Sequence, residues 1–281
     1  MQHTHFLQSL LEYTSEIARQ NFGKVLGYNK SSDNNQVLTE TDLEIGKYIV
    51  DAITTQFPDH NIIDEEAGVI DRGSTYTWVV DPIDGTSNFA NGAPTYGTMI
   101  GLLEEATPIA GGLSLPSFHE IFLAEKGQGA TCNGVKLSVS KEEHLLKTLV
   151  AYGIDGHQEE PSYTTEECQT LAKIILGIRN LRSSNSVFDI GMLVKGNYGG
   201  ALNRTSKIWD NVAQQILIEE AGGVYTDFWG KPMDYTDPLQ KAETNYTYCA
   251  AAPQLHGQLQ SLINDSLQIS SRKNSSFLVK Y

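Results

Sequence analysis

The sequence predicts an α+β fold, in which one region pairs antiparallel strands and another alternates helices with strands. Residues 96–139 form short β-rich runs broken by Gly, Pro and Asn, a pattern typical of antiparallel pairing. Residues 148–252 alternate between helical and extended patterns. The chain has 281 residues and a hydrophobic content of 40%, so it can bury a sizeable core.

The first part of the chain is expected to contain two helices and two buried strands. Apolar residues recur at roughly helical spacing over 6–18, which indicates an amphipathic helix. The polar stretch at 27–36 has nothing to bury and is interpreted as a loop. A second helix is predicted over 41–57, where a following proline stops it. Strands are then expected at 61–64 and at 75–81, the second ending on an aspartate.

The rest of the chain shows no repeat and no low-complexity tract. No linker rich in Pro, Gly or Ser cuts it, so we expect two halves, 1–180 and 181–281, to pack tightly as one catalytic unit. The final residues, 264–281, carry no clear pattern and are expected to be partly mobile. Strands are predicted near 148–153, 179–182, 198–202, 223–227 and 246–252, and helices near 164–177, 187–195 and 210–221.

The charge balance limits the partners that the protein can bind. The chain has 20 Lys and Arg residues against 34 Asp and Glu residues, a formal net charge of -14. Such a protein repels nucleic-acid polymers and anionic membranes, although it can bind a small anion where cations or backbone amides line a pocket. We therefore expect neither a nucleic-acid polymer nor a membrane as a partner.

The cysteines and the N-terminus indicate a reducing compartment. Cys132, Cys168 and Cys249 lie far apart without C-x-x-C spacing, so reduced thiols are a better interpretation than a disulfide or zinc framework. The N-terminus lacks the basic and apolar regions of a signal peptide, and no segment approaches the ~20 apolar residues of a membrane span. A cytoplasmic location is expected.

The first of three acidic clusters follows the strand predicted at 61–64. It consists of Asp64, Glu65 and Glu66. A run of like charges is usually a solvated surface feature. Taken alone, this cluster predicts no more than an exposed turn.

The second cluster lies in V-V-D-P-I-D-G-T-S-N-F at 79–89, where Asp81 and Asp84 end a hydrophobic run. Two carboxylates about 4 Å apart repel each other by about 4 kcal/mol in partly buried surroundings, so their proximity needs an offset. Capping of a short helix explains Asp84 but not Asp81. Pro82 should end the pairing of the strand, and the amides of 85–87 could form an anion cradle.

The third cluster begins with the pair Trp209-Asp210. An apolar helical face follows, and Gly222-Gly223 ends the helix. Asp210 falls at the N-terminus of this predicted helix, where an N-cap role is an ordinary alternative to a site role.

Together, the three clusters predict a divalent metal site. Glu65, Asp81, Asp84 and Asp210 lie at strand ends or helix starts, where α/β architectures assemble sites. Carboxylate oxygens suit Mg²⁺ or Mn²⁺, whereas zinc would prefer His or Cys. The carbonyl of Ile83 could complete a coordination sphere. We therefore expect a bound cation to offset the repulsion between the two aspartates of D-P-I-D.

Several motifs of the chain resemble those of the inositol monophosphatase family of Mg²⁺-dependent, lithium-sensitive phosphatases. They are V-L-T-E-T-D, D-E-E, D-P-I-D-G-T-S-N-F, G-A-T-C-N-G-V-K-L-S-V-S and W-D-N-V-A-Q-Q-I-L-I-E-E-A-G-G, whose order and spacing agree from residue 37 to about 255. The resemblance implies a layered α-β-α-β-α sandwich of the inositol monophosphatase and sugar phosphatase type. It places the active site where the two sheets meet.

The resemblance also implies which residues hold metal. The first ion would be bound by Glu65, Asp81 and the Ile83 carbonyl. The second would be bound by Asp81, Asp84 and Asp210. A third, weaker ion could share Glu65, so two or three Mg²⁺ ions are expected, with Mn²⁺ as a possible substitute.

Catalytic roles follow from the same resemblance. Glu66 and the pair of Asp42 and Thr86 would orient the attacking water, while the amides of Gly85 and Thr86 would hold the phosphate. Water on a divalent cation becomes a usable nucleophile near neutral pH, and cations neutralise phosphoryl oxygens and the leaving alkoxide.

The substrate-binding positions depart from the family pattern. Ser184, Asn185 and Ser186 stand where G-S-A is usual, and Asn203 stands where inositol phosphatases place a glutamate that binds inositol hydroxyls. Arg204 could favour a second anionic group, although an exposed surface arginine is an equally good interpretation. Inositol specificity is therefore not implied. The segment W-D-N-V-A-Q also makes the start of its helix bulkier than in the family.

Hydrolysis of a small phosphomonoester is the leading hypothesis for the function. Inositol phosphate, a sugar bisphosphate, 3′-phosphoadenosine 5′-phosphate and histidinol phosphate all remain open as substrates. The alternative is a catalytically weak, metal-binding regulatory homologue, which the altered W-D-N-V-A-Q segment would suit. The resemblance further suggests a homodimer.

Overall fold

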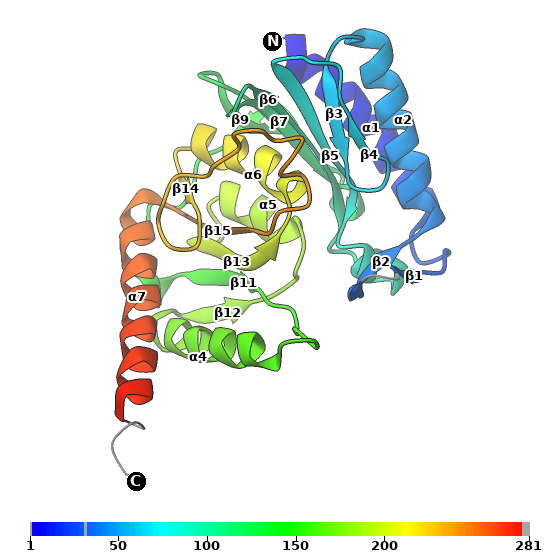
Figure 1. The fold of residues 1–281 in the computed structure, drawn as a ribbon. Helices are drawn as coiled ribbons and strands as arrows, with labels where there is room; N and C mark the ends of the chain where they lie inside the picture. The colour runs from blue at the N-terminus through cyan, green and yellow to red at the C-terminus, as the bar shows by residue number, and fades with distance from the viewer. Residues whose placement is uncertain (1, 31–32, 277–281) are drawn as a thin grey trace.

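The helices and sheets stack in five layers in the computed structural model, which describes residues 2–30 and 33–276 (Figure 1). Helices α1 (Gln2–Asn21) and α2 (Glu40–Gln56) cover one face of a large sheet. Helices α5 (Phe188–Val194) and α6 (Ile208–Glu220) fill the space between this sheet and a smaller one. Helices α4 (Pro161–Gly177) and α7 (Pro253–Ser276) lie on the far side of the smaller sheet. This order confirms the α-β-α-β-α sandwich.

The large sheet has eight strands in the order β10-β9-β8-β7-β6-β5-β3-β4. All its neighbours pair antiparallel except β3 and β5, which are parallel. The antiparallel region predicted from the Gly- and Pro-broken runs is therefore confirmed. The strands are β3 (Asn61–Asp64), β4 (Gly68–Ile70), β5 (Tyr76–Asp84), β6 (Gly97–Glu104), β7 (Thr107–Leu115), β8 (Glu120–Glu125), β9 (Gly129–Cys132) and β10 (Val135–Lys136).

The smaller sheet has five strands in the order β12-β11-β13-β15-β14. β11 pairs parallel with both β12 and β13, whereas β15 pairs antiparallel with β13 and β14. The chain passes from the large sheet to the smaller one between Lys136 and Leu149. The division into halves at residue 180 stays a prediction. The strands are β11 (Leu149–Gly153), β12 (Asn180–Arg182), β13 (Gly200–Ser206), β14 (Val224–Thr226) and β15 (Tyr246–Ala251).

Helix α6 approaches the large sheet closely because two sheet positions there lack side chains. A Cβ added at Gly101 would lie 2.6 Å from Val212 Cγ1, and one at Gly111 would lie 2.7 Å from Ile216 Cγ2. The bulk of Val212 therefore packs on β6. Further along, Tyr225 donates its hydroxyl to Asn211 Oδ1 at 2.7 Å, which ties the helix start to β14.

One sequence prediction about the N-terminal part of the chain is wrong. The stretch at 27–36 contains β1 (Tyr28–Lys30) and β2 (Asp33–Leu38), which pair antiparallel, with 31–32 outside the described residues. Polar residues can form such a ladder because its hydrogen bonds come from the backbone. At the other end of the chain, the tail at 264–281 belongs to α7 as far as Ser276 and lies outside the described residues at 277–281, so its partial mobility stays a prediction.

The strand carrying D-P-I-D does not end at Asp81, as its proline had suggested. Asp81 pairs with Met99, the register shifts, and Asp84 then pairs with Gly97. The shift is a β-bulge, which tolerates a residue without an N–H, and Pro82 still offers its carbonyl to Thr98 Oγ1 at 2.8 Å. The bulge carries β5 past both aspartates.

Candidate active site

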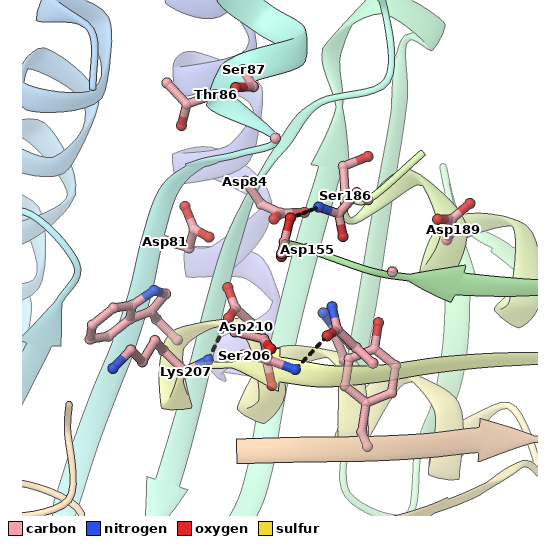
Figure 2. A pocket seen from close by; sticks show the side chains of 18 of the residues that line it. Asp81, Asp84, Thr86, Ser87, Asp155, Ser186, Asp189, Ser206, Lys207 and Asp210 are labelled. Atoms are coloured by element: carbon pink, nitrogen blue, oxygen red, sulfur yellow. Dashed lines mark hydrogen bonds between the residues drawn. The ribbon is translucent and has the colours of Figure 1, made fainter. Parts of the chain in front are cut away.

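A cavity of about 240 Å³ opens between the two sheets (Figure 2). One side comes from the end of β5 and the short helix α3 (Thr86–Ala90), the other from β11, β13 and the start of α6. The predicted site residues that line it are Glu65, Asp81, Ile83, Asp84, Gly85, Thr86, Asn185, Asn203 and Asp210. The predicted residues outside its lining are Asp42, Glu66, Ser184 and Arg204.

Neither aspartate suspected of capping a helix is an N-cap. Helix α3 is preceded by Gly85 in the left-handed conformation (φ 82°), and Asp84 instead accepts a hydrogen bond from the amide of Val187. Helix α6 begins two residues before Asp210, so Lys207 is its N-cap. The Asp210 carboxylate accepts the Lys207 amide at 2.6 Å, which satisfies one of the exposed donors of the helix start.

The carboxylates of Asp81, Asp84 and Asp210 converge on one point of the cavity. Ligand oxygens from the three lie within 4.8 Å of one another. Asp81 is buried, and its Oδ1 has no hydrogen-bond partner among the described residues. A buried carboxylate oxygen without a donor is costly unless a cation binds it. The arrangement therefore fits a divalent metal ion with oxygen ligands.

The cluster resists ionisation in the absence of a cation. Burial raises the pKa of Asp81 well above its ordinary value, and the neighbouring Glu65 and Asp84 raise it further. Burial also raises the pKa of Asp84, with Asp210 adding to the effect and the Val187 amide opposing it. Burial likewise raises the pKa of Asp210, to about 7.

These shifts predict how the metal-free protein responds to pH. A folded-state pKa above the unfolded value means that these groups hold more protons in the folded protein, so their contribution to stability is greatest below about pH 4 and is lost as the pH rises toward 7. Bound Mg²⁺ should remove this loss. The melting temperatures of dialysed and Mg²⁺-loaded protein should therefore diverge as the pH increases. The titration of exposed carboxylates affects both samples equally and cancels in the comparison. A constant gap would contradict the metal assignment.

Asp42 and Thr86 lie together beside the cavity, as the sequence had paired them. Thr86 Oγ1 is 3.1 Å from Asp42 Oδ1 and 2.7 Å from the carbonyl oxygen of Ile83. Asp42 also accepts the Thr39 amide at 2.9 Å, within the first turn of α2. Burial raises the pKa of Asp42 to about 6. The pair can hold a proton at the edge of the pocket.

The D-E-E turn is organised by its first residue. Asp64 is buried, and its Oδ1 accepts the amides of Glu66 at 2.9 Å and Ala67 at 2.7 Å. Glu65 donates its amide to the Val80 carbonyl, which presents its side chain to the cavity. Glu66 lies outside the lining, and its charge contributes to the raised pKa of Asp42.

Arg204 turns away from the cavity and is not the exposed arginine that was the alternative. Its guanidinium carbon lies 5.7 Å from the ring centroid of Phe228 and 5.4 Å from that of Trp229, at contact distance for cation–π pairing. Its Nη2 is 3.5 Å from Glu166 Oε1, and its side chain is 18% exposed. Ser184 also lies outside the cavity lining, and its backbone amide donates a hydrogen bond to Asp189 Oδ2 at 3.1 Å.

The lining contains further residues with acidic or basic side chains that were not predicted from the sequence: Asp155, His157, Asp189 and Lys207. Asp155 follows β11 and Lys207 precedes α6, so their positions at element ends were the available signal. Asp189 lies inside α5, where nothing in the sequence separated it from a surface residue.

The fold and the acidic cavity are those of a family of phosphatases that act on small phosphorylated substrates. The chain belongs to the inositol monophosphatase family, whose sequence model matches residues 2–269. The family resemblance predicted from the motifs is confirmed. Among the described residues, none of the helices combines the length and apolar character needed to cross a membrane.

Relatives of the chain carry several names. A fructose-1,6-bisphosphatase/inositol-1-monophosphatase of Aquifex aeolicus is 31% identical over 228 residues, 79% of this chain and 84% of that protein. The Nus factor SuhB of Salmonella typhimurium is 30% identical over 199 residues, 70% of this chain and 74% of that protein. The solved structure of an IMPase of Thermotoga maritima is 26% identical, with a TM-score of 0.83 over 95% of this chain and 99% of that one.

Proposed function

We propose that this protein hydrolyses a small phosphomonoester in a reaction that requires Mg²⁺. The observation that carries the proposal is the convergence of Asp81 and Asp84 from β5 with Asp210 from α6, with ligand oxygens within 4.8 Å of one another. Three carboxylates of raised pKa in a cavity are a binding site for divalent cation and, through it, for a phosphate group.

Under this proposal Glu65, Asp81 and the Ile83 carbonyl would hold a first ion, and Asp81, Asp84 and Asp210 a second. A bound Mg²⁺ supplies positive charge that acidifies coordinated water and neutralises phosphoryl oxygens. Mn²⁺ should substitute because it accepts the same ligands.

The other residues would position the reacting groups. Asp42 would accept a hydrogen bond from the Thr86 hydroxyl, which leaves the Thr86 oxygen able to accept a hydrogen bond from the attacking water and so to orient it. Glu66, which lies outside the cavity lining, would also help to orient the attacking water. The amides of Gly85 and Thr86, at the start of α3, would donate to phosphate oxygens and hold the group in line.

Removal of the metal is expected to abolish turnover. Inorganic phosphate release should be measured on a panel of phosphomonoesters with dialysed protein, then with Mg²⁺ restored in the millimolar range. Activity should return with Mg²⁺ and to a lesser degree with Mn²⁺. Full turnover in the presence of a chelator would contradict the metal assignment. Absence of turnover on every substrate would favour a regulatory homologue.

Thr86→Ala is expected to lower kcat by about 10- to 100-fold while KM changes little, because the hydroxyl acts on water in the transition state. Thr86→Ser keeps the hydroxyl and should retain most of the turnover. Steady-state kinetics on both variants measure the difference. An unchanged kcat in the alanine variant would remove Thr86, and with it Asp42, from the mechanism.

Three further parts of the proposal rest on the family resemblance and on composition. Lithium should inhibit, the protein should form a homodimer, and its location should be cytoplasmic. A second candidate function, a regulatory homologue with weak activity, is favoured by the relatives named Nus factor SuhB. The substrate panel separates these two functions.

A further inference from the structure

The polar side chains that line the cavity on the side of the smaller sheet include Asp155, Asn185, Asn203 and Thr205, and we call these four the polar belt. β11 and β13 run parallel, and Gly153 pairs with Asn203 where their pairing ends. Parallel strands deliver the residues at their carboxyl ends to one edge of a sheet. Asp155 follows β11 at this edge, so the belt is a product of the sheet topology.

The belt is fixed by its own contacts. Asn185 donates its side-chain amide to Asp155 Oδ1 at 2.9 Å, and Thr205 donates its backbone amide to Asn203 Oδ1 at 2.7 Å (Figure 2). A Cβ at Gly153 would lie 2.6 Å from both Asn185 Oδ1 and Asn203 Nδ2. The two amides therefore meet over Gly153, in space that any larger residue would fill.

The belt presents the Asp155 carboxylate to a cavity with few cationic side chains among the lining residues that the structure describes. Lys207 is the one Lys or Arg among the lining residues that the structure describes, and its Nζ is 3.6 Å from Glu243 Oε2. His157 lies 3.8 Å from the carboxylate of Glu167. Arg204, next to Asn203 in the chain, packs on aromatic rings outside the lining.

From this arrangement, and resting on the proposed phosphatase function, we propose that the polar belt selects phosphomonoesters whose alcohol carries a positive charge, with Asp155 as the specificity-determining residue. An ammonium or imidazolium group would be attracted by the Asp155 carboxylate, while Asn185 and Asn203 accept or donate hydrogen bonds to hydroxyls. A second phosphate would meet a like charge, with no guanidinium among the described lining residues to balance it.

The experiment compares kcat/KM for three substrates at saturating Mg²⁺: L-histidinol phosphate (cationic alcohol), myo-inositol 1-phosphate (neutral) and fructose 1,6-bisphosphate (anionic). The expected order is cationic, then neutral, then anionic, with at least about tenfold between the first and last, because like charges in a binding site are strongly disfavoured. Asp155→Asn should reduce this ratio by about tenfold.

The variant is chosen to keep the fold of the belt. Asn at 155 can still accept the Asn185 amide, so only the charge is lost. Glu159→Gln is the matched control, since it makes the same charge change at an exposed position nearby, outside the cavity, and should leave the order unaltered. If Asp155→Asn does not fold, the order measured on the unaltered protein decides.

The outcomes separate the two proposals. A preference for the bisphosphate, or a ratio of cationic to anionic kcat/KM that Asp155→Asn leaves unchanged, would overturn the role of the polar belt while the phosphatase function stands. Absence of phosphate release from all three substrates with Mg²⁺ present would overturn the proposed function and the belt's role with it.

Discussion

Asp210→Asn is expected to lower kcat by at least about 100-fold, a loss of about 3 kcal/mol of transition-state stabilisation. Asp210 contributes one of the three carboxylates that converge in the cavity, and it comes from α6, across the cavity from β5. Asparagine at this position can still accept the Lys207 amide, so the helix start is preserved. What is lost is one negative charge at the cation site.

The same variant should be as stable as the original protein or more stable when metal is absent. The pKa of Asp210 is raised to about 7, so at pH 8 its charge is held against the preference of its surroundings. Thermal melts of dialysed protein at pH 8, together with steady-state kinetics, measure both effects.

A control for the Asp210 variant should make the same chemical change without touching the cavity. Asp71→Asn does this, since Asp71 is exposed and accepts the Gly73 amide at 2.9 Å, a bond that Asn can also accept. It should alter neither kcat nor the melting temperature. Near-normal turnover of Asp210→Asn with an unchanged melting temperature would leave Asp210 as a helix-start residue and undo the two-metal proposal.

The sequence was sufficient to predict the residues that converge because each acidic motif adjoins a recognisable hydrophobic run. Asp81 lies near the end of a buried strand and Asp210 in the first turn of an amphipathic helix, so hydrophobic periodicity places both aspartates close to element ends. The antiparallel region was predictable for a similar reason, since its Gly and Pro punctuation is local. Local sequence patterns were sufficient wherever the geometry depends on residues that are neighbours in the sequence.

Features that depend on distant partners were missed. The bulge in β5 depends on Thr98 and on renewed pairing at Gly97, and a proline taken alone indicated only the end of a strand. The orientation of Arg204 depends on two aromatic rings more than twenty positions away. Asp155 acquires a role only because β11 and β13 lie side by side. None of these contacts leaves a periodic signal in the sequence.

Gly85→Ala is expected to damage stability and activity together. Gly85 has a φ of 82°, a conformation that costs an alanine about 1 kcal/mol or more. A Cβ there would also lie 2.8 Å from Ser186 Cβ and 3.0 Å from the Thr95 carbonyl oxygen, and such overpacking costs a further ~2 kcal/mol. Relief of the clash would displace the start of α3, and we expect kcat/KM to fall by at least about 100-fold.

Gly92→Ala separates the cost of the backbone conformation from the cost of the steric clash. It has the same kind of left-handed backbone conformation as Gly85→Ala but creates no clash. Gly92 has a φ of 74°, and a Cβ there would meet nothing within 4 Å, so only the backbone cost of about 1 kcal/mol applies. Urea unfolding should show Gly85→Ala to be the less stable variant by about 2 kcal/mol, with activity lost in that variant alone. Equal destabilisation of both with activity intact would mean that Ser186 can move aside. The loop at 184–186 would then not fix the backbone that is proposed to hold the phosphate.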